Sequence, residues 1–147
     1  MVSWAFIHIL RAYSELMPFY MFNAYGASTE WIAKDRALLR DTVAAMIEAN
    51  RAIYRERDKV VPIIVEATKK PKEAVEYAIE SNIKNCIWSV NTGFTEQRTQ
   101  WSIDNSVENG DIEAAKKPTI EQVANTKLAE EAMELAGGRV TIGNCTE

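Results

Sequence analysis

Few side chains of this 147-residue sequence have the types and spacing that catalysis requires. Asp104 and Glu108 are four residues apart, so on a helix they would share one face as a general acid–base pair. No nucleophile, set of metal ligands or glycine-rich phosphate loop accompanies them. His8 is the only histidine, and without nearby partners for a zinc site or a triad it reads as a half-buried side chain on an apolar helix. We therefore expect no enzyme: no catalytic residue, no metal and no cofactor.

Ligand binding is a second possible chemistry, and the stretch "FNAYGASTEWIAKD" at residues 22–35 suggests it. Aromatic residues lead through a small-residue corner into a helix-like segment, and the first N–H groups of a helix can bind an anion. The ligand-binding candidates here are Asn23, Tyr25, Ser28 and Thr29. The alternative is a corner without a ligand, in which Ser28 or Thr29 only caps the helix.

The loop "WSVNTG", residues 88–93, is the second ligand candidate. It combines Trp88 with polar side chains, and Asn91 is the polar residue that we select as a ligand contact. Binding residues concentrate in loops. The alternative is that the tryptophan ring packs in the core, because amphipathic rings serve cores and ligand clefts equally well.

The elements that must position these residues are mainly α-helical. The hydrophobic period is close to 3.6 residues nearly everywhere, which predicts six or seven short helices with one or two minor strands. The run "FYMFNAY", residues 19–25, predicts one short strand, and "RVTIGN", residues 139–144, a last extended piece. The helices that we expect cover 2–17, 29–35, 36–57, 59–70, a segment with Pro71 in its first turn, 94–107 and 119–136.

Some boundaries and faces of these helices follow from single residues. In 36–57 the apolar residues form one stripe, and Glu48, Arg51 and Arg55 fall outside it, the first two as an i,i+3 pair. Asp58 caps the next helix, which puts Pro62 at a tolerated fourth position. Thr95 opens the helix that ends near Gly110. A capping box at 119–122 starts the last helix, whose expected buried residues are Ile120, Val123, Leu128 and Leu135.

Composition restricts the classes of partner. The 21 acidic and 17 basic residues give a net charge of −4, which argues against nucleic acid or an anionic membrane as the main partner. The apolar stretch at 2–10 is too short to span a bilayer, and it lacks the basic leader and cleavage site of an export signal. Two cysteines, Cys86 and Cys145, are too few for a disulfide framework. We expect free thiols, with a single bridge as the alternative.

The order of the segments resembles a known family. "NAYGASTEWIAKDRALLRDTVAAMIEANRAIYRER" resembles the inter-lobe strand and following helices of the nitrate/sulfonate/taurine-type solute-binding proteins of ABC importers. "DNSVENGDIEAAKKPTIEQVANTKLAEEAMELAGG" is similar to their C-terminal tail. Thiamine-pyrimidine synthases are similar in fold. The resemblance covers about residues 19–138 and rests on the succession of segments.

The resemblance implies the C-terminal part of a two-lobed α/β protein that encloses a small solute between its lobes. It implies delivery to an ABC permease, a periplasmic or lipid-anchored location, and cleft-facing side chains at 23–29. Most of the first lobe is missing, and so is a signal peptide, so the chain expressed as written would stay cytoplasmic. Residues 1–18 match nothing in the family and form an N-terminal apolar helix of uncertain origin, while 19–147 form the partial solute-binding region.

Two functions remain open at this point. The first is a fragment of an ABC-transporter substrate-binding protein for a sulfonate, nitrate, taurine or pyrimidine solute, which binds its solute when the missing lobe is supplied. The alternative is a stand-alone helical module that binds a partner or itself without a ligand. Apolar helix faces shaped for a missing lobe would be exposed, so we expect a homo-oligomer. A synthase-like enzyme is disfavoured by the missing catalytic cluster.

Overall fold

The computed structural model describes residues 13–21 and 23–147. Helices account for 63% of these residues and no sheet is present among them, which confirms the prediction of a mainly α fold. The only strand-like pairing in the described ranges is one antiparallel bridge between Ile142 and Cys145. The helices are α1 (Tyr13–Leu16), α2 (Thr29–Lys34), α3 (Arg36–Arg55), α4 (Arg57–Thr68), α5 (Lys72–Lys84), α6 (Glu96–Glu108), the 3₁₀ turn η1 (Ala114–Lys116), α7 (Ile120–Val123) and α8 (Thr126–Leu135).

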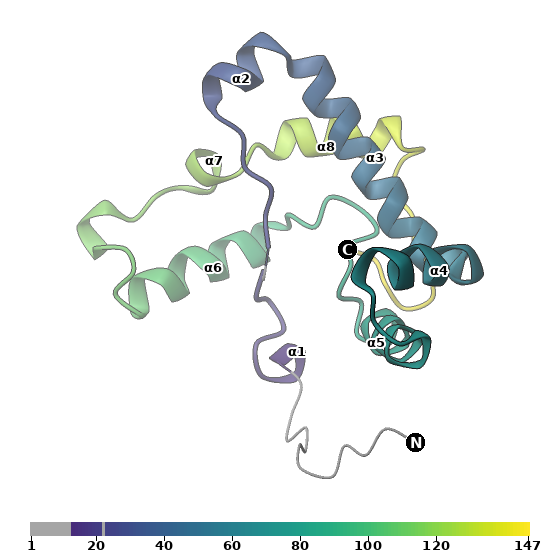
Figure 1. Ribbon diagram of the computed structural model, residues 1–147. Helices are drawn as coiled ribbons and strands as arrows, with labels where there is room; N and C mark the ends of the chain where they lie inside the picture. The colour runs from purple at the N-terminus through teal and green to yellow at the C-terminus, as the bar shows by residue number, and fades with distance from the viewer. Residues whose placement is uncertain (1–12, 22) are drawn as a thin grey trace.

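The most extensive contact between helices joins α3 and α8, which lie side by side (Figure 1). Ala44 and Ile47 of α3 pack against Ala132 and Met133 of α8, and all four are buried. Ala132 has no exposed surface, and its small side chain lets the two helix backbones approach closely. The apolar stripe predicted for 36–57 therefore exists. α8 covers its middle part, whereas Ile53 packs against the cluster formed by α4 and α5.

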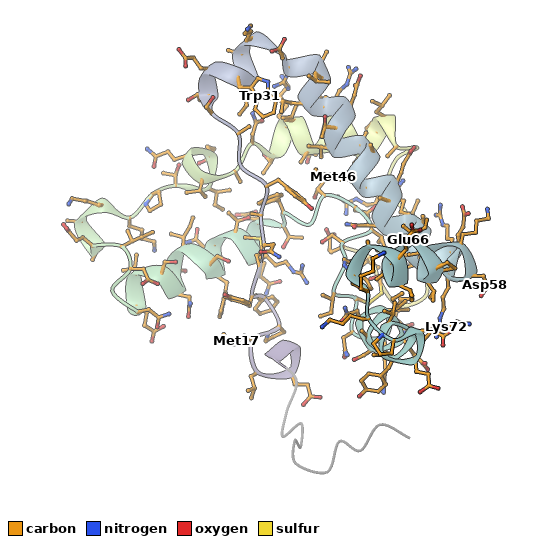
Figure 2. The ribbon with its side chains drawn as sticks, viewed as in Figure 1. Met17, Trp31, Met46, Asp58, Glu66 and Lys72 are labelled. Atoms are coloured by element: carbon orange, nitrogen blue, oxygen red, sulfur yellow. A yellow bond between two sulfur atoms is a disulfide. The ribbon has the colours of Figure 1, made fainter. Side chains whose placement is uncertain are left out.

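The pair α4 and α5 forms a second, smaller core. Val61 of α4 packs against Val75 and Ile79 of α5, and Trp88 covers this cluster from the following loop. The charged side chains of Asp58 and Lys72 lie on the outer face of the pair (Figure 2). The hairpin thus has an apolar inner side, as the helical pattern predicts, while its outer side carries charged residues together with the exposed Ile63 and Tyr77.

The predicted start of the helix around Pro62 is wrong by two residues. Glu56, not Asp58, is the N-cap, and α4 already begins at Arg57. Pro62 therefore lies inside the helix rather than in its first turn, and the carbonyl of Asp58 loses its intrahelical donor. Asp58 is exposed, so water can satisfy that carbonyl.

The arm formed by α6, η1 and α7 extends to the side of the molecule opposite α4 and α5 (Figure 1). Thr95 caps α6 as predicted, because its Oγ1 accepts a hydrogen bond from the Arg98 N–H at 3.1 Å. Gly110 has φ +81° just after the C-cap, which confirms its predicted place at the helix end. The Tyr20 ring meets the Trp101 ring edge to face, with centroids 6.2 Å apart.

The single helix predicted for 119–136 is wrong, because the chain divides it into α7 and α8. Ala124 is extended, and Asn125 caps α8 by accepting a hydrogen bond from the Leu128 N–H at 3.1 Å. Val123 and Leu135 are half exposed instead of buried, and Ile120 is only partly buried. Leu135 lies two residues after the buried Met133, on another face of α8. Leu128 is buried as expected.

The strand predicted for 19–25 is also wrong. The described residues of this stretch have no strand pairing. Those between α1 and α2 run across the front of the molecule without a helix or strand (Figure 1). An extended segment becomes a strand only when a neighbour supplies hydrogen bonds, and no strand elsewhere in the described ranges does so. Only the last residues of the predicted N-terminal helix, those in α1, are described; His8 and the apolar residues before it lie outside the described residues.

The prediction of free thiols is wrong as well: Cys86 and Cys145 form a disulfide. Their Cα atoms are 5.4 Å apart although 59 residues separate them in sequence. The bridge ties the end of α5 to the last residues of the chain, next to the loop that leads to α6 (Figure 1). Among the described residues, none of the helices is both long enough and apolar enough to cross a membrane.

Candidate functional site

The first group of predicted ligand residues lies in the exposed segment ahead of α2. Asn23, Tyr25, Ser28 and Thr29 are all exposed, and Tyr25 keeps 81% of its surface open to solvent. Ser28 is the N-cap of α2, since its Oγ accepts a hydrogen bond from the Trp31 N–H at 3.1 Å. The capping role proposed as the alternative for Ser28 is therefore present. A ligand role for the four residues stays a prediction.

The second group lies inside the molecule. Asn91 is only 1% exposed, and its Nδ2 donates to the carbonyls of Val140 at 2.9 Å and Thr146 at 2.7 Å. Its Oδ1 accepts from the Val140 N–H at 2.9 Å. Trp88 packs on the α4–α5 core. Both residues are thus held by the protein itself, and the structure does not unite the six candidates in one pocket.

Arg51 lies at the centre of this second group, although the sequence pattern predicts it outside the buried stripe. That placement is wrong, because Arg51 is 4% exposed. Its Nε donates to the Val90 carbonyl at 2.7 Å, and one terminal nitrogen donates to the Ala136 carbonyl. The other donates to the Gly138 carbonyl at 2.7 Å and to Asn91 Oδ1 at 3.3 Å. We call Arg51, Asn91 and these carbonyls the carbonyl hub.

Side chains of α3 donate hydrogen bonds to three consecutive carbonyls of the loop. Tyr54 Oη donates to the Trp88 carbonyl at 2.7 Å, Asn50 Nδ2 to the Ser89 carbonyl at 3.0 Å, and Arg51 to that of Val90. A loop without secondary structure has no ladder to satisfy its carbonyls, so buried side-chain donors must do so. One face of α3 therefore fixes the conformation of residues 88–90.

The electrostatics of the hub are unusual because dipoles, not carboxylates, surround the buried cation. Two of the carbonyls follow α8, where the helix dipole places partial negative charge. Burial lowers the pKa of the Arg51 guanidinium, and the positive charge of Arg55 lowers it further, while Glu48 acts in the opposite direction. An arginine nevertheless stays protonated in a protein. Burial likewise raises the pKa of Tyr54, whose hydroxyl remains a donor to Trp88.

The sequence did hold a signal for Arg51. It lies seven residues after Ala44 and four after Ile47, so on a helix it continues the stripe that both of them define. Its charge favours the outer face of the helix, but its register with Ala44 and Ile47 places it on the inner face. An arginine in register with a buried apolar stripe indicates hydrogen-bond acceptors from a distant part of the chain. Here two of them are carbonyls at the end of α8.

Asp104 and Glu108, the two carboxylates considered for acid–base chemistry, are both exposed on α6. Asp104 accepts from Lys117 Nζ at 2.6 Å and from Gln100 Nε2 at 2.9 Å, and the hydrogen bond from Lys117 is the main reason that its pKa is lowered. Glu131 pairs with Arg36 at 2.8 Å across α3 and α8. Within the part of the chain that the structure describes, no group of three or more histidine, cysteine, aspartate or glutamate side chains could hold a metal ion.

Comparison with known proteins adds no family to these observations. No protein-family model matches the chain, and neither a curated protein nor a solved structure matches it.

Proposed function

We propose that this chain is the C-terminal, mainly helical part of a two-lobed solute-binding protein that captures a small anion or heterocycle for an ABC importer. The solute class is a sulfonate, nitrate, taurine or pyrimidine. The proposal rests on the resemblance of residues 19–138 and on one structural observation, the exposed segment 23–28, which we call the corner segment. In this reading the chain binds solute only when a first lobe completes the cleft.

We interpret the corner segment as a strand that lacks a pairing partner. Its six residues are all exposed and have no regular secondary structure, Ser28 at its end has an extended backbone, and the capped start of α2 follows directly. Backbone N–H and C=O groups in such a segment can pair with the edge of a sheet. A crossing strand between two lobes would have this character once the sheet of the other lobe is removed.

Exposed apolar side chains elsewhere agree with a missing neighbour. Trp31 of α2 and Leu38 of α3 are 46% and 58% exposed, and both lie on the first helices after the corner segment. Large apolar side chains on an otherwise ordinary surface often mark an interface. A first lobe that pairs with the corner segment would lie within reach of both side chains.

The proposed location is the cell envelope. A disulfide persists in oxidising compartments, which include the periplasm, and is rare in the cytosol. The Cys86–Cys145 bridge therefore supports an exported protein.

The test is reconstitution. The chain is mixed with separately produced first lobes from nitrate-, sulfonate- and taurine-binding proteins, and complex formation is followed by size-exclusion chromatography with light scattering. Calorimetry then measures solute binding by the chain alone and by each mixture. We expect no binding at millimolar solute by the chain alone, since one wall supplies at most half of the polar contacts, each worth about 1 kcal/mol. Binding by the chain alone tighter than about 100 micromolar, or no complex with any lobe, contradicts the proposal.

A second candidate function is self-association, and it is favoured by apolar residues far from the corner segment. Ile63 of α4 and Tyr77 of α5 are 65% and 66% exposed on the hairpin. Light scattering over a range of concentrations up to tens of micromolar tests this. A dimer that Ile63→Ser with Tyr77→Ser abolishes supports the alternative, and a strict monomer contradicts it.

A further inference from the structure

The end of α5 contains a residue that its backbone geometry disfavours. The Cys86 N–H donates to the Ile83 carbonyl at 3.2 Å and the Ile87 N–H to the Asn82 carbonyl at 3.0 Å, which is the Schellman pattern of a helix C-terminus. Cys86 takes the left-handed position of that motif, with φ +50°. Glycine is the usual residue there because a side chain is strained in this region.

The end of α8 shows the same motif with the usual residue. The Gly137 N–H donates to the Glu134 carbonyl at 3.1 Å and the Gly138 N–H to the Met133 carbonyl at 2.9 Å, with φ +91° at Gly137. The α8 end is part of the carbonyl hub, because Arg51 binds the Gly138 carbonyl. The α5 end leads into the loop of the hub, since Asn91 follows Cys86 by five residues. The difference between the two ends is that only α5 carries a reactive side chain in this position.

The disulfide links Cys86 to the C-terminal segment, residues 139–147. Besides the bridge, this segment has few attachments to the loop. Asn91 binds the backbone of Val140 and Thr146, and the Val90 N–H donates to the Glu147 carbonyl at 3.1 Å. The segment has no regular secondary structure beyond the bridge between Ile142 and Cys145. Four hydrogen bonds contribute about 4 kcal/mol, which is less than the cost of ordering nine residues, so the segment also depends on the covalent bond.

We propose that the Cys86–Cys145 bridge is a redox latch, and that a dithiol reductant opens it and detaches residues 139–147 from the loop 86–91. Cys86 is half-buried while Cys145 is 4% exposed, so the thiolate of the reductant attacks the Cys86 sulfur. Cys145 leaves as a thiolate and takes up a proton. The second thiol of the reductant then attacks the reductant's own sulfur in the mixed disulfide, which releases Cys86 as a thiol and leaves the reductant oxidised.

The consequence reaches the connection between α5 and α6. When the segment detaches, Asn91 loses its three bonds to Val140 and Thr146 and keeps only the one from Arg51. The loop 86–95 is the direct link from the α4–α5 hairpin to the arm (Figure 1). Opening the latch therefore loosens the joint of the arm while the α4–α5 core and the α3–α8 contact stay packed. This inference does not depend on the proposed transport function.

The experiment is amide hydrogen exchange on the full chain, oxidised and after treatment with dithiothreitol, with thiol alkylation to verify the redox state. We expect the amides of Val90, Val140 and Cys145 to exchange faster in the reduced chain, on the order of 100-fold, because the loop-closure constraint is lost. Amides within α4 and α5 should exchange at unchanged rates.

A matched variant separates the bridge from reductant effects. Cys86→Gly removes the cross-link and keeps the backbone geometry of the α5 end, so it should show fast exchange in residues 139–147 without reductant and no further change with it. Three outcomes overturn the latch: resistance of the bridge to the dithiol, unchanged exchange in 139–147 after complete reduction, or faster exchange throughout α4 and α5, which would make the bridge a global staple.

Discussion

The corner segment and the loop 88–91 have similar composition but differ in burial. Each places an asparagine and an aromatic residue in a loop beside a helix end, Asn23 with Tyr25 and Asn91 with Trp88. In the loop, three successive carbonyls receive donors from α3 and the asparagine is enclosed. In the corner segment every side chain is exposed. The comparison shows that local composition does not decide whether a polar loop is exposed or enclosed; partners that are distant in sequence decide it.

The largest expected effect tests whether Arg51 is the centre of the enclosed region. Arg51→Ala leaves the carbonyls of Val90, Ala136 and Gly138 without their donor in a buried place, and we expect the free energy of unfolding to fall by about 3–5 kcal/mol in urea titrations. Arg55→Ala is the matched control, because Arg55 lies one turn further on an exposed surface, and it should change stability by less than about 0.5 kcal/mol. Equal effects of the two substitutions would contradict the hub.

The next effect compares the two asparagines directly. Asn91→Ala removes three hydrogen bonds to the C-terminal segment and one from Arg51, so we expect a loss of about 2–3 kcal/mol. Asn23→Ala removes an exposed side chain and should stay within about 0.5 kcal/mol. Thermal and urea unfolding of both variants measure the difference. A costly Asn23→Ala would show that the corner segment is packed in solution.

The sequence predicted what is local and missed what is not. Thr95 and Gly110 were identified because a cap and a helix end depend on residues only three or four positions away. Arg51 was misplaced because its acceptors lie 39 to 87 residues further along the chain. The bridge between Cys86 and Cys145 has no local signature for the same reason.

One other error comes from competition between nearby signals. The capping box at Thr119 is present, with the Thr119 N–H bonded to Gln122 Oε1 at 2.8 Å, but Asn125 starts a second helix six residues later. The helical period alone does not show that the first helix ends before the cap at Asn125. It therefore does not predict the break at Ala124. For the candidate site, Ser28 could be assigned a capping role from its type alone, whereas the enclosure of Asn91 required the fold.

A smaller effect sharpens the comparison at the disulfide. In the presence of reductant the bridge contributes nothing, and Cys86 keeps only the strain of its left-handed backbone. Cys86→Gly should then stabilise the chain by about 1 kcal/mol relative to reduced wild type, while Cys86→Ala should leave it nearly unchanged. Urea unfolding of the three proteins in dithiothreitol gives the difference. If glycine gives no gain over alanine, the backbone at the end of α5 relaxes when the bridge opens.

The smallest expected effect on stability belongs to Tyr25. Its side chain is 81% exposed, so little apolar area is lost on substitution, and Tyr25→Ala should change the free energy of unfolding by less than about 0.5 kcal/mol. The same substitution should matter only when a first lobe is present, because pairing of the corner segment would then enclose the ring and a buried aromatic contributes about 1.5–3 kcal/mol. Titration of the first lobe into wild type and variant, followed by calorimetry, separates these states. A variant that is already destabilised alone would place Tyr25 in the core of this chain, and a variant with unchanged lobe affinity would remove the corner segment from the interface. Only stability that is unchanged, combined with weakened association, fits a strand that is completed by another lobe.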